Sequence, residues 1–186
     1  MRTIILISLV CLLAFVFVLS SGSARKRRHN RRIRSAEGVR NLLAEGALLP
    51  AQAVSYLRKV NPYTFEELVL DGFLRDGYKV KRNKRYSGDG GIDGRVSKDG
   101  EEYLVQSKRY RGYISRQHVE DFSRVCTRER LKGFFVHTGK TGDASWETAG
   151  TFGNVDIVSG DRMLRLVGYQ NKQENQEFFH NQSSRI

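Results

Sequence analysis

Hydrophobic and polar residues alternate in regular patterns from about residue 61 onward. Apolar positions spaced three and four apart over residues 65–73 predict a helix that ends near Gly77. Further elements are expected in this order: strands at 78–83, 92–97 and 101–110, a helix at 114–130, a strand at 132–138, a helix at 143–152 and a strand at 155–158. This order, helix, three strands, helix, strand, helix, strand, predicts an α/β fold with a mixed sheet flanked by helices.

An uncharged and almost wholly apolar run occupies residues 3–20. A run of this length can span a bilayer as one helix, and it is longer than the roughly 7 to 15 apolar residues of a signal peptide. We therefore expect a transmembrane anchor at residues 1–24. A cleaved signal peptide and a buried core helix are the alternatives.

Charge is distributed unevenly along the chain. Its 186 residues include 32 Lys and Arg against 20 Asp and Glu, a net charge of +12. Eight basic residues and no acidic ones precede residue 35, which leaves 24 basic against 20 acidic residues, or +4, for the rest. A basic run at 25–34 keeps its side of a membrane helix in the cytoplasm and attracts anionic lipid. The following domain is therefore expected in the cytoplasm, at a single-pass anchor in a bacterial inner membrane.

Two flanking segments show no chemical motif. Short helices are expected at 36–45 and 51–60, so that residues 25–60 form a basic juxtamembrane run and a helical spacer. Residues 168–186 are polar and are expected to be a disordered tail. Two cysteines are too few for a disulfide scaffold or a four-cysteine zinc site, and the four histidines are scattered without ligand spacing. The chemistry is therefore expected in one domain at 61–167.

A predicted hairpin brings three polar side chains together. Asp99-Gly100 between two strand patterns is a strong signal for a two-residue turn. With that turn, Asp93 lies opposite Gln106, and Lys108 shares their face because side chains alternate along a strand. A three-residue loop would reverse the parity and separate them.

This cluster has the chemistry of a metal-dependent nuclease. Carboxylate and amide oxygens suit Mg²⁺, and a bound metal activates water and stabilises charge on a phosphodiester, while a lysine orients or deprotonates the nucleophile. An ion pair beside a glutamine on the protein surface is the alternative.

Six ordered motifs resemble those of the Mrr-like restriction endonucleases, a family of the PD-(D/E)xK nucleases: FEE at 65–67, DGY at 76–78, GDGGIDG at 88–94, VQSKRY at 105–110, GFFVHTG at 133–139 and VDIV at 155–158. The resemblance implies a restriction-endonuclease-like fold that cleaves DNA with Mg²⁺ or Mn²⁺. It also implies that Asp93 and Gln106 bind the metal and that Lys108 is the catalytic lysine. Glutamine, where many relatives have an acid, leaves less negative charge for the metal.

The resemblance also implies an acid on the first helix of the domain. Glu66 and Glu67 are both candidates. A capping box between Thr64 and Glu67 would give Glu67 a structural role and leave Glu66 for the site, unless the helix starts earlier, at residues 61–62. Asp89 is either a turn residue or a further site acid.

Two local basic clusters flank the proposed site and favour a polyanionic substrate. We expect DNA contacts from Lys84, Arg85, Arg109, Arg111 and Arg116. A solvated strand edge is the alternative explanation. No nucleotide cofactor is expected, because Gly139-Lys140-Thr141 lacks the earlier glycine of a phosphate-binding loop.

The sequence thus predicts a membrane-tethered, metal-dependent DNA endonuclease that restricts foreign or modified DNA. Cutting both strands with one site per chain favours a homodimer. A catalytically silent, membrane-tethered DNA-binding module and a membrane or partner scaffold are the alternative functions.

Overall fold

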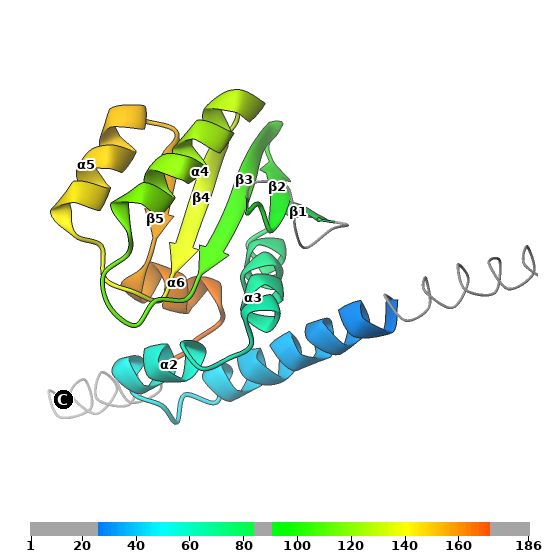
Figure 1. Ribbon diagram of the computed structural model, residues 1–186. Helices are drawn as coiled ribbons and strands as arrows, with labels where there is room; N and C mark the ends of the chain where they lie inside the picture. Colours follow the sequence, from blue (N-terminus) through cyan, green and yellow to red (C-terminus); the bar gives the residue numbers. More distant parts are fainter. Residues whose placement is uncertain (1–25, 84–90, 172–186) are drawn as a thin grey trace, which may run out of the picture.

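A five-stranded mixed sheet forms the centre of the molecule (Figure 1). The computed structural model describes residues 26–83 and 91–171. Strands β1 and β2 pair antiparallel, as do β2 and β3, whereas β3, β4 and β5 run parallel. The strands follow one another across the sheet in chain order: β1 (Lys79–Arg82), β2 (Gly94–Lys98), β3 (Glu101–Lys108), β4 (Lys132–His137) and β5 (Val155–Val158). The predicted α/β fold with a mixed sheet is confirmed.

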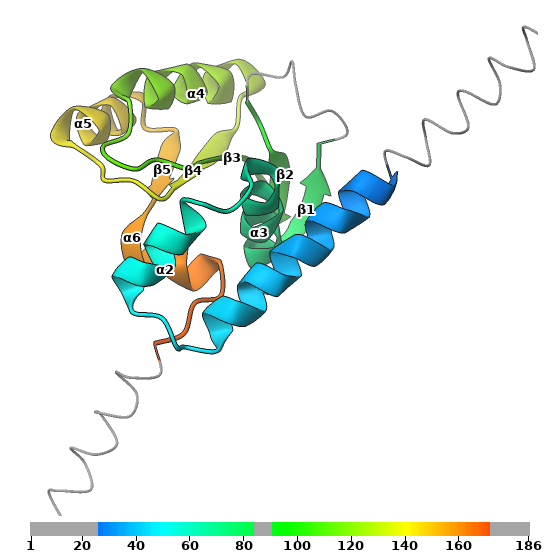
Figure 2. The ribbon, with the colours of Figure 1, turned by 60° about the horizontal axis from the view of Figure 1, so that its bottom comes forward.

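Helices cover both faces of the sheet, as Figures 1 and 2 show. One face carries α4 (Arg116–Glu129) and α5 (Asp143–Phe152). The other face carries α2 (Pro50–Leu57), α3 (Pro62–Arg75), α6 (Gly160–Leu166) and a helix at residues 26–44, called the N-terminal helix below. Both parallel crossovers therefore pack their helices, α4 and α5, on the same face.

The sheet separates two hydrophobic cores. Leu104 on β3 packs with residues of α4 and α5, whereas its neighbour Val105 packs with residues of α2, α3 and α6. Both side chains are fully buried, because successive residues of a strand point to opposite faces. Because β3 is packed on both faces, the residues at its C-terminal end are held in fixed positions.

The segment expected to be a spacer is packed against this domain. Ala36, Val39 and Leu43 lie on one face of the N-terminal helix and are buried in the same core as α3. The helix does not begin at residue 36, because residues 26–35 are helical as well. Burial of an apolar stripe stabilises a helix more than local sequence preference does, so the basic residues 26–34 extend a helix that is anchored by its later turns.

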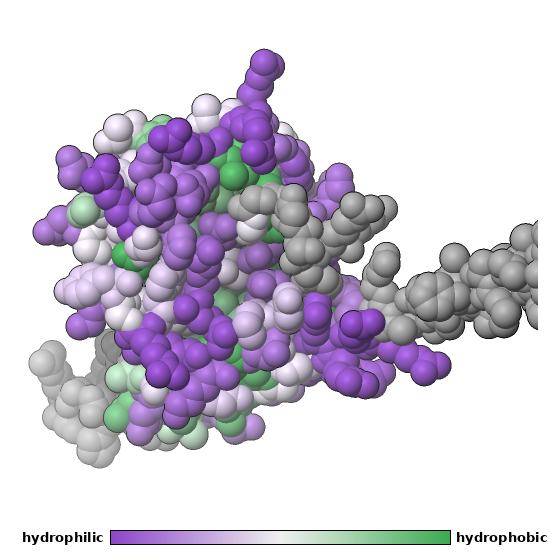
Figure 3. All heavy atoms as spheres, in the orientation of Figure 1, coloured by the Kyte–Doolittle hydropathy of each residue, from purple (hydrophilic) through white to green (hydrophobic). Residues whose placement is uncertain are grey.

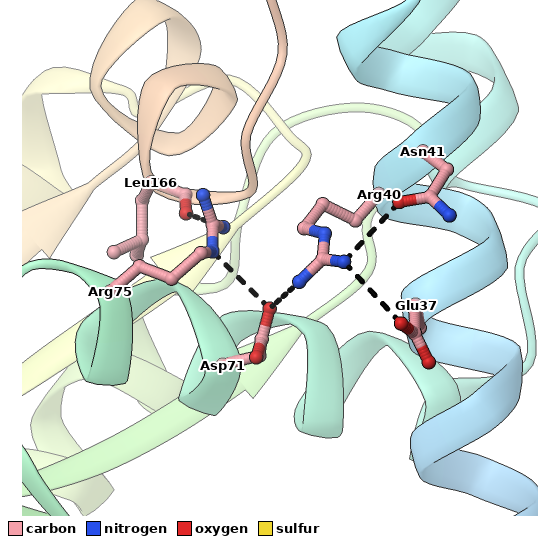
Figure 4. Close-up of polar contacts among 6 residues, drawn as sticks. All are labelled: Glu37, Arg40, Asn41, Asp71, Arg75 and Leu166. Atoms are coloured by element: carbon pink, nitrogen blue, oxygen red, sulfur yellow. Dashed lines mark hydrogen bonds and ion pairs between the residues drawn. The ribbon is translucent and has the colours of Figure 1, made fainter.

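Polar contacts hold the N-terminal helix alongside α3 (Figure 4). Asp71 of α3 accepts hydrogen bonds from Arg40 Nη1 and from Arg75 Nε, both at 3.3 Å. Arg75 also donates through Nη2 to the backbone carbonyl of Leu166, at 3.0 Å. One carboxylate thus connects the N-terminal helix with α3, and Arg75 extends the connection to α6.

The beginning of the polar tail is ordered, contrary to expectation. The Tyr169 hydroxyl donates to the Leu48 carbonyl at 2.7 Å, and the Gln170 backbone N–H donates to the Leu43 carbonyl at 3.2 Å. The sequence patterns also missed α6, which is only 7 residues long. Three of its residues, Met163, Leu164 and Leu166, are buried, so tertiary burial rather than local pattern defines this end of the domain.

Some expectations concern residues outside the described part of the chain. These are the transmembrane run at 3–20, the start of the basic run, and the tail from residue 172. Within residues 26–83 and 91–171, no helix combines the length and the apolar character needed to cross a membrane.

Candidate active site

The hairpin between β2 and β3 has the predicted register. Arg95 pairs with Leu104 and Lys98 with Glu101, which places Asp93 opposite Gln106 when the pairing is continued. Both turn residues, Asp99 and Gly100, have positive φ, 53° and 84°, as the two central positions of a type I′ turn require.

Asp93 lies just before β2 and is tied to β3 by three hydrogen bonds. Its backbone N–H donates to the Val105 carbonyl at 2.8 Å. Its carboxylate oxygen Oδ2 accepts from Ser107 twice, from the backbone N–H at 2.6 Å and from the hydroxyl at 2.7 Å. Ser107 carries no signal in the strand pattern, because its side chain lies on the face opposite to residues 106 and 108.

Gln106 is buried and anchors the chain that leads to Asp93. Its Nε2 donates to the Gly91 carbonyl at 2.7 Å, and the side chain is only 5% exposed. The other end of the amide, Oε1, is the atom with metal-ligand chemistry. Gly91 has a φ of 80°, and a Cβ there would lie 2.3 Å from Gln106 Nε2, so this close approach requires glycine.

A cleft of about 290 Å³ opens where the end of β3 meets the first turn of α3 and the start of α4. Glu66 of α3 and Lys108 of β3 line it, and both are partly buried. Ser107, which holds the Asp93 carboxylate, is part of the same wall. Residues far apart in the sequence thus place one acid, Glu66, and the ammonium group of Lys108 around one cavity. Asp93 and Gln106 are not among the residues that line it, and Asp93 is connected to its wall through Ser107.

Glu66 has an unusual proton affinity. Burial and, to a smaller extent, the charge of Asp93 raise the pKa of its carboxyl to about 8, although Arg32 of the N-terminal helix lowers it. Glu66 therefore holds a proton through much of the neutral range when no cation is near. A divalent cation between the two carboxylates would offset their repulsion, so these residues fit a metal ion.

The available donors favour a hard cation. Within the described residues, no three or more His, Cys, Asp and Glu side chains are grouped to hold a metal. The donors here are the carboxylates of Glu66 and Asp93, the Gln106 amide oxygen and backbone carbonyls. Such an oxygen set with few protein ligands suits Mg²⁺ or Mn²⁺, since Mg²⁺ keeps several of its waters.

The predicted capping box between Thr64 and Glu67 is wrong. Helix α3 begins at Pro62, and the side chain of Asn61 caps it by accepting a hydrogen bond from the Tyr63 N–H at 3.0 Å. Proline is favoured at the first helical position because its φ is already helical and its missing N–H would have no partner there.

Glu67 instead belongs to a buried ionic contact. Its side chain is 3% exposed and lies 2.7 Å from Arg82 Nε of β1 and 3.3 Å from His29 Nδ1 of the N-terminal helix. A carboxylate buried in this way is paired because leaving it alone would be costly. Glu67 therefore connects three elements, whereas Glu66, one residue earlier, faces the cleft.

The residues expected to bind DNA differ in their surroundings. Arg111 and Arg116 are exposed, and they are close in sequence to Tyr110 and His118, which line the cleft. Arg109 lines the cleft, but its Nη1 donates to the carbonyls of Arg58 (3.1 Å) and Val60, so its guanidinium holds the connection between α2 and α3. Lys84, Arg85 and Asp89 lie outside the described residues.

The face that carries α4 and α5 is strongly polar. In the view of Figure 3 hydrophilic side chains cover most of it, and hydrophobic residues form small separate patches. A surface of this kind suits a polar partner better than an extended apolar interface.

Comparisons with known proteins agree with this architecture. The Type IV methyl-directed restriction enzyme EcoKMrr of Escherichia coli (strain K12) is 30% identical over 124 residues, which are 62% of this chain and 41% of that protein. The structure of the MspJI restriction endonuclease in complex with a 27-mer oligonucleotide aligns with a TM-score of 0.51 at 23% identity, over 64% of this chain and 31% of that chain. The chain thus spans less than half the length of either protein. Residues 57–167 match the restriction endonuclease family Mrr_cat, and the chain belongs to this family.

Proposed function

We propose that this protein is a DNA endonuclease that uses Mg²⁺ or Mn²⁺ and hydrolyses phosphodiester bonds. The observation that carries the proposal is the meeting of Glu66 and Lys108 at one cleft whose wall, Ser107, holds the Asp93 carboxylate. Membership of a restriction endonuclease family supports it.

Each site residue has a distinct part in the proposed reaction. Asp93, Gln106 and Glu66 would hold the metal ion, which when bound supplies an acidified water and stabilises negative charge on the phosphate. Glu66 would hold the metal as the carboxylate and release its proton to solvent, since its pKa of about 8 reflects burial and the neighbouring Asp93 charge. Lys108 directs its ammonium group to the phosphate or, as the neutral amine, takes a proton from the attacking water.

DNA contacts extend beyond the cleft in this proposal. Arg111 and Arg116 are exposed and close in sequence to residues that line the cleft, and Lys84 and Arg85 are close in sequence to Asp93. Phosphate contacts by these side chains make binding weaker as salt rises. The biological substrate would be foreign or modified DNA, and a homodimer would supply the second site for a double-strand cut.

The proposal is tested with the purified full-length chain on methylated, unmethylated and branched DNA. We expect cleavage with Mg²⁺ or Mn²⁺ and none with a chelator. Asp93→Ala and Lys108→Ala should each lower the rate by at least about 100-fold while the fold and most of the DNA affinity remain. DNA binding without cleavage of any substrate would instead indicate a catalytically silent module, and the absence of salt-dependent binding would indicate a scaffold.

We also propose that residues 3–20 tether the domain to the cytoplasmic face of a membrane, with the basic run at 25–34 against anionic lipid. Cell fractionation of the full-length chain tests this. The protein should stay with membranes after a high-salt wash, and deletion of residues 1–24 should release it. Recovery of the full-length chain in the soluble fraction would contradict the tether.

A further inference from the structure

His118 lies at the candidate site but has no part in the chemistry described so far. It belongs to the first turn of α4 and lines the same cleft as Glu66 and Lys108. Its Nδ1 is hydrogen-bonded to the hydroxyl of Tyr110, and the two ring centroids are 5.9 Å apart. The imidazole is therefore held from one side, while the ring borders the cavity.

Tyr110 is itself fixed. Its backbone N–H donates to Thr138 Oγ1, and its carbonyl accepts from the same hydroxyl, each at 3.0 Å. A tyrosine with a fixed backbone and a bonded hydroxyl orients its partner imidazole, as residues that support a metal ligand or a catalytic histidine commonly do.

The hydrogen bonds around Tyr110 determine where its proton lies. Burial raises the pKa of Tyr110 to about 12, a value that includes a smaller lowering by the Ser115 backbone, so the hydroxyl keeps its proton at neutral pH. A hydroxyl that donates this proton to Nδ1 of His118 leaves the hydrogen of a neutral imidazole on Nε2.

The surroundings of His118 favour the neutral imidazole. Burial lowers the pKa of His118, the positive charge of Lys108 lowers it further, and Asp121 opposes them with a smaller effect. A neutral His118 can donate a hydrogen bond to the same anion that the Lys108 ammonium group attracts. A protonated His118 would instead be repelled by Lys108.

We propose that His118 binds a phosphate oxygen of DNA in the cleft through its Nε2–H, and that Tyr110 is the positioning residue that sets this tautomer. The inference rests on the proposed nuclease function, because it assigns a further contact for the same substrate. The ligand is a phosphodiester, which accepts one hydrogen bond from His118 and lies near the charge of Lys108.

The tautomer can be tested without any nuclease activity. ¹⁵N chemical shifts of the histidine side chains in the full-length chain, recorded without DNA or metal, should show His118 protonated on Nε2 alone. Tyr110→Phe removes the hydroxyl and keeps the ring, and it should give a mixture of both tautomers. Tyr78→Phe, on the opposite face of the sheet, is the matched control and should change nothing. A hydrogen on Nδ1 in the unaltered protein would overturn the proposal.

The contact is tested by DNA binding in the presence of a chelator and by single-turnover cleavage with Mg²⁺. His118→Ala should lower DNA affinity, or the cleavage rate at saturating DNA, by roughly 10-fold or more, the effect of losing one hydrogen bond to a charged group. His118→Gln offers an amide N–H at a similar position and should recover part of the loss. Gln117→Ala, at the exposed neighbouring position of α4, controls for changes in the helix.

Two results would overturn this assignment. One is wild-type affinity and rate in both His118 variants. The other is an equal loss in the alanine and glutamine variants together with an equal loss of thermal stability, which would indicate a packing role. If the unaltered chain binds DNA but cleaves none, the proposed function fails while the binding measurements still decide whether His118 contacts phosphate.

Discussion

Ser107 donates two hydrogen bonds to one oxygen of Asp93, from its backbone N–H at 2.6 Å and from its hydroxyl at 2.7 Å. The two residues are 14 positions apart in the sequence and meet only because the hairpin returns β3 alongside Asp93. This pair orients the carboxylate that we propose as a metal ligand, so Ser107 affects the chemistry without being acidic or basic itself.

Removal of the Ser107 hydroxyl should lower the cleavage rate and leave DNA affinity nearly unchanged. Ser107→Ala keeps the backbone bond and loses one bond to a charged group, so a decrease of about 10-fold in the single-turnover rate is expected. Ser97→Ala on β2 is the matched control, since Ser97 lies toward the turn end of the hairpin. A wild-type rate in Ser107→Ala would show that the backbone N–H alone orients Asp93.

The raised pKa of Glu66, about 8, predicts a pH-dependent stability in the absence of metal. The folded chain holds a proton on Glu66 that the unfolded chain, with a pKa near the ordinary value of 4.5, has already lost. Stability from this group is therefore complete below pH 4.5 and falls as pH rises to about 8. Thermal unfolding in a chelator should show the melting temperature of the wild type falling between pH 5 and pH 9 relative to Glu66→Gln.

Mg²⁺ should reduce this difference at pH 8 to 9, because the cation favours the ionised carboxyl. An identical pH profile for wild type and Glu66→Gln would contradict the assignment of the raised pKa.

Substitution of Glu67 should lower stability, whereas substitution of Glu66 should lower cleavage. Glu67→Ala leaves Arg82 and His29 without their buried acid. We expect a loss of about 2 kcal/mol in the free energy of unfolding, below the roughly 3 to 5 kcal/mol typical of a fully buried pair because Arg82 is partly exposed. Glu66→Ala should abolish cleavage without this destabilisation. Urea denaturation and cleavage assays of both variants separate the two roles. A destabilised Glu66→Ala together with a stable but inactive Glu67→Ala would contradict both assignments.

Gly91→Ala should damage the site through Gln106. The new Cβ would lie 2.3 Å from Gln106 Nε2, and the φ of 80° is unfavourable for alanine by about 1 to 2 kcal/mol. We expect the amide to be displaced, with a large loss of cleavage rate and a lower melting temperature. Gly150→Ala in α5 has no atom within 4 Å of its Cβ and should instead stabilise the helix by about 0.5 to 1 kcal/mol. Normal cleavage by Gly91→Ala would show that the amide position is unimportant.

Local sequence was sufficient for the central hairpin. A two-residue turn at Asp99-Gly100 requires backbone conformations that few other pairs adopt, and the strict alternation of side chains then assigns Asp93 and Gln106 to opposing positions. The start of α3 was harder to predict, because Asn61-Pro62 and Thr64 were competing helix starts. The fixed φ of Pro62 favoured the earlier one.

By itself, the sequence determined the order of most helices and strands, the mixed sheet, the hairpin register and the resemblance to a nuclease family. Only the tertiary structure decided that residues 26–44 pack beside the domain as a helix, that Glu67 is buried against Arg82 while Glu66 faces the cleft, and that Tyr110 bonds His118. The difference has a physical cause. Turns and alternating patterns depend on neighbouring residues, whereas burial, pKa shifts and ionic contacts depend on which distant segments come together when the chain folds.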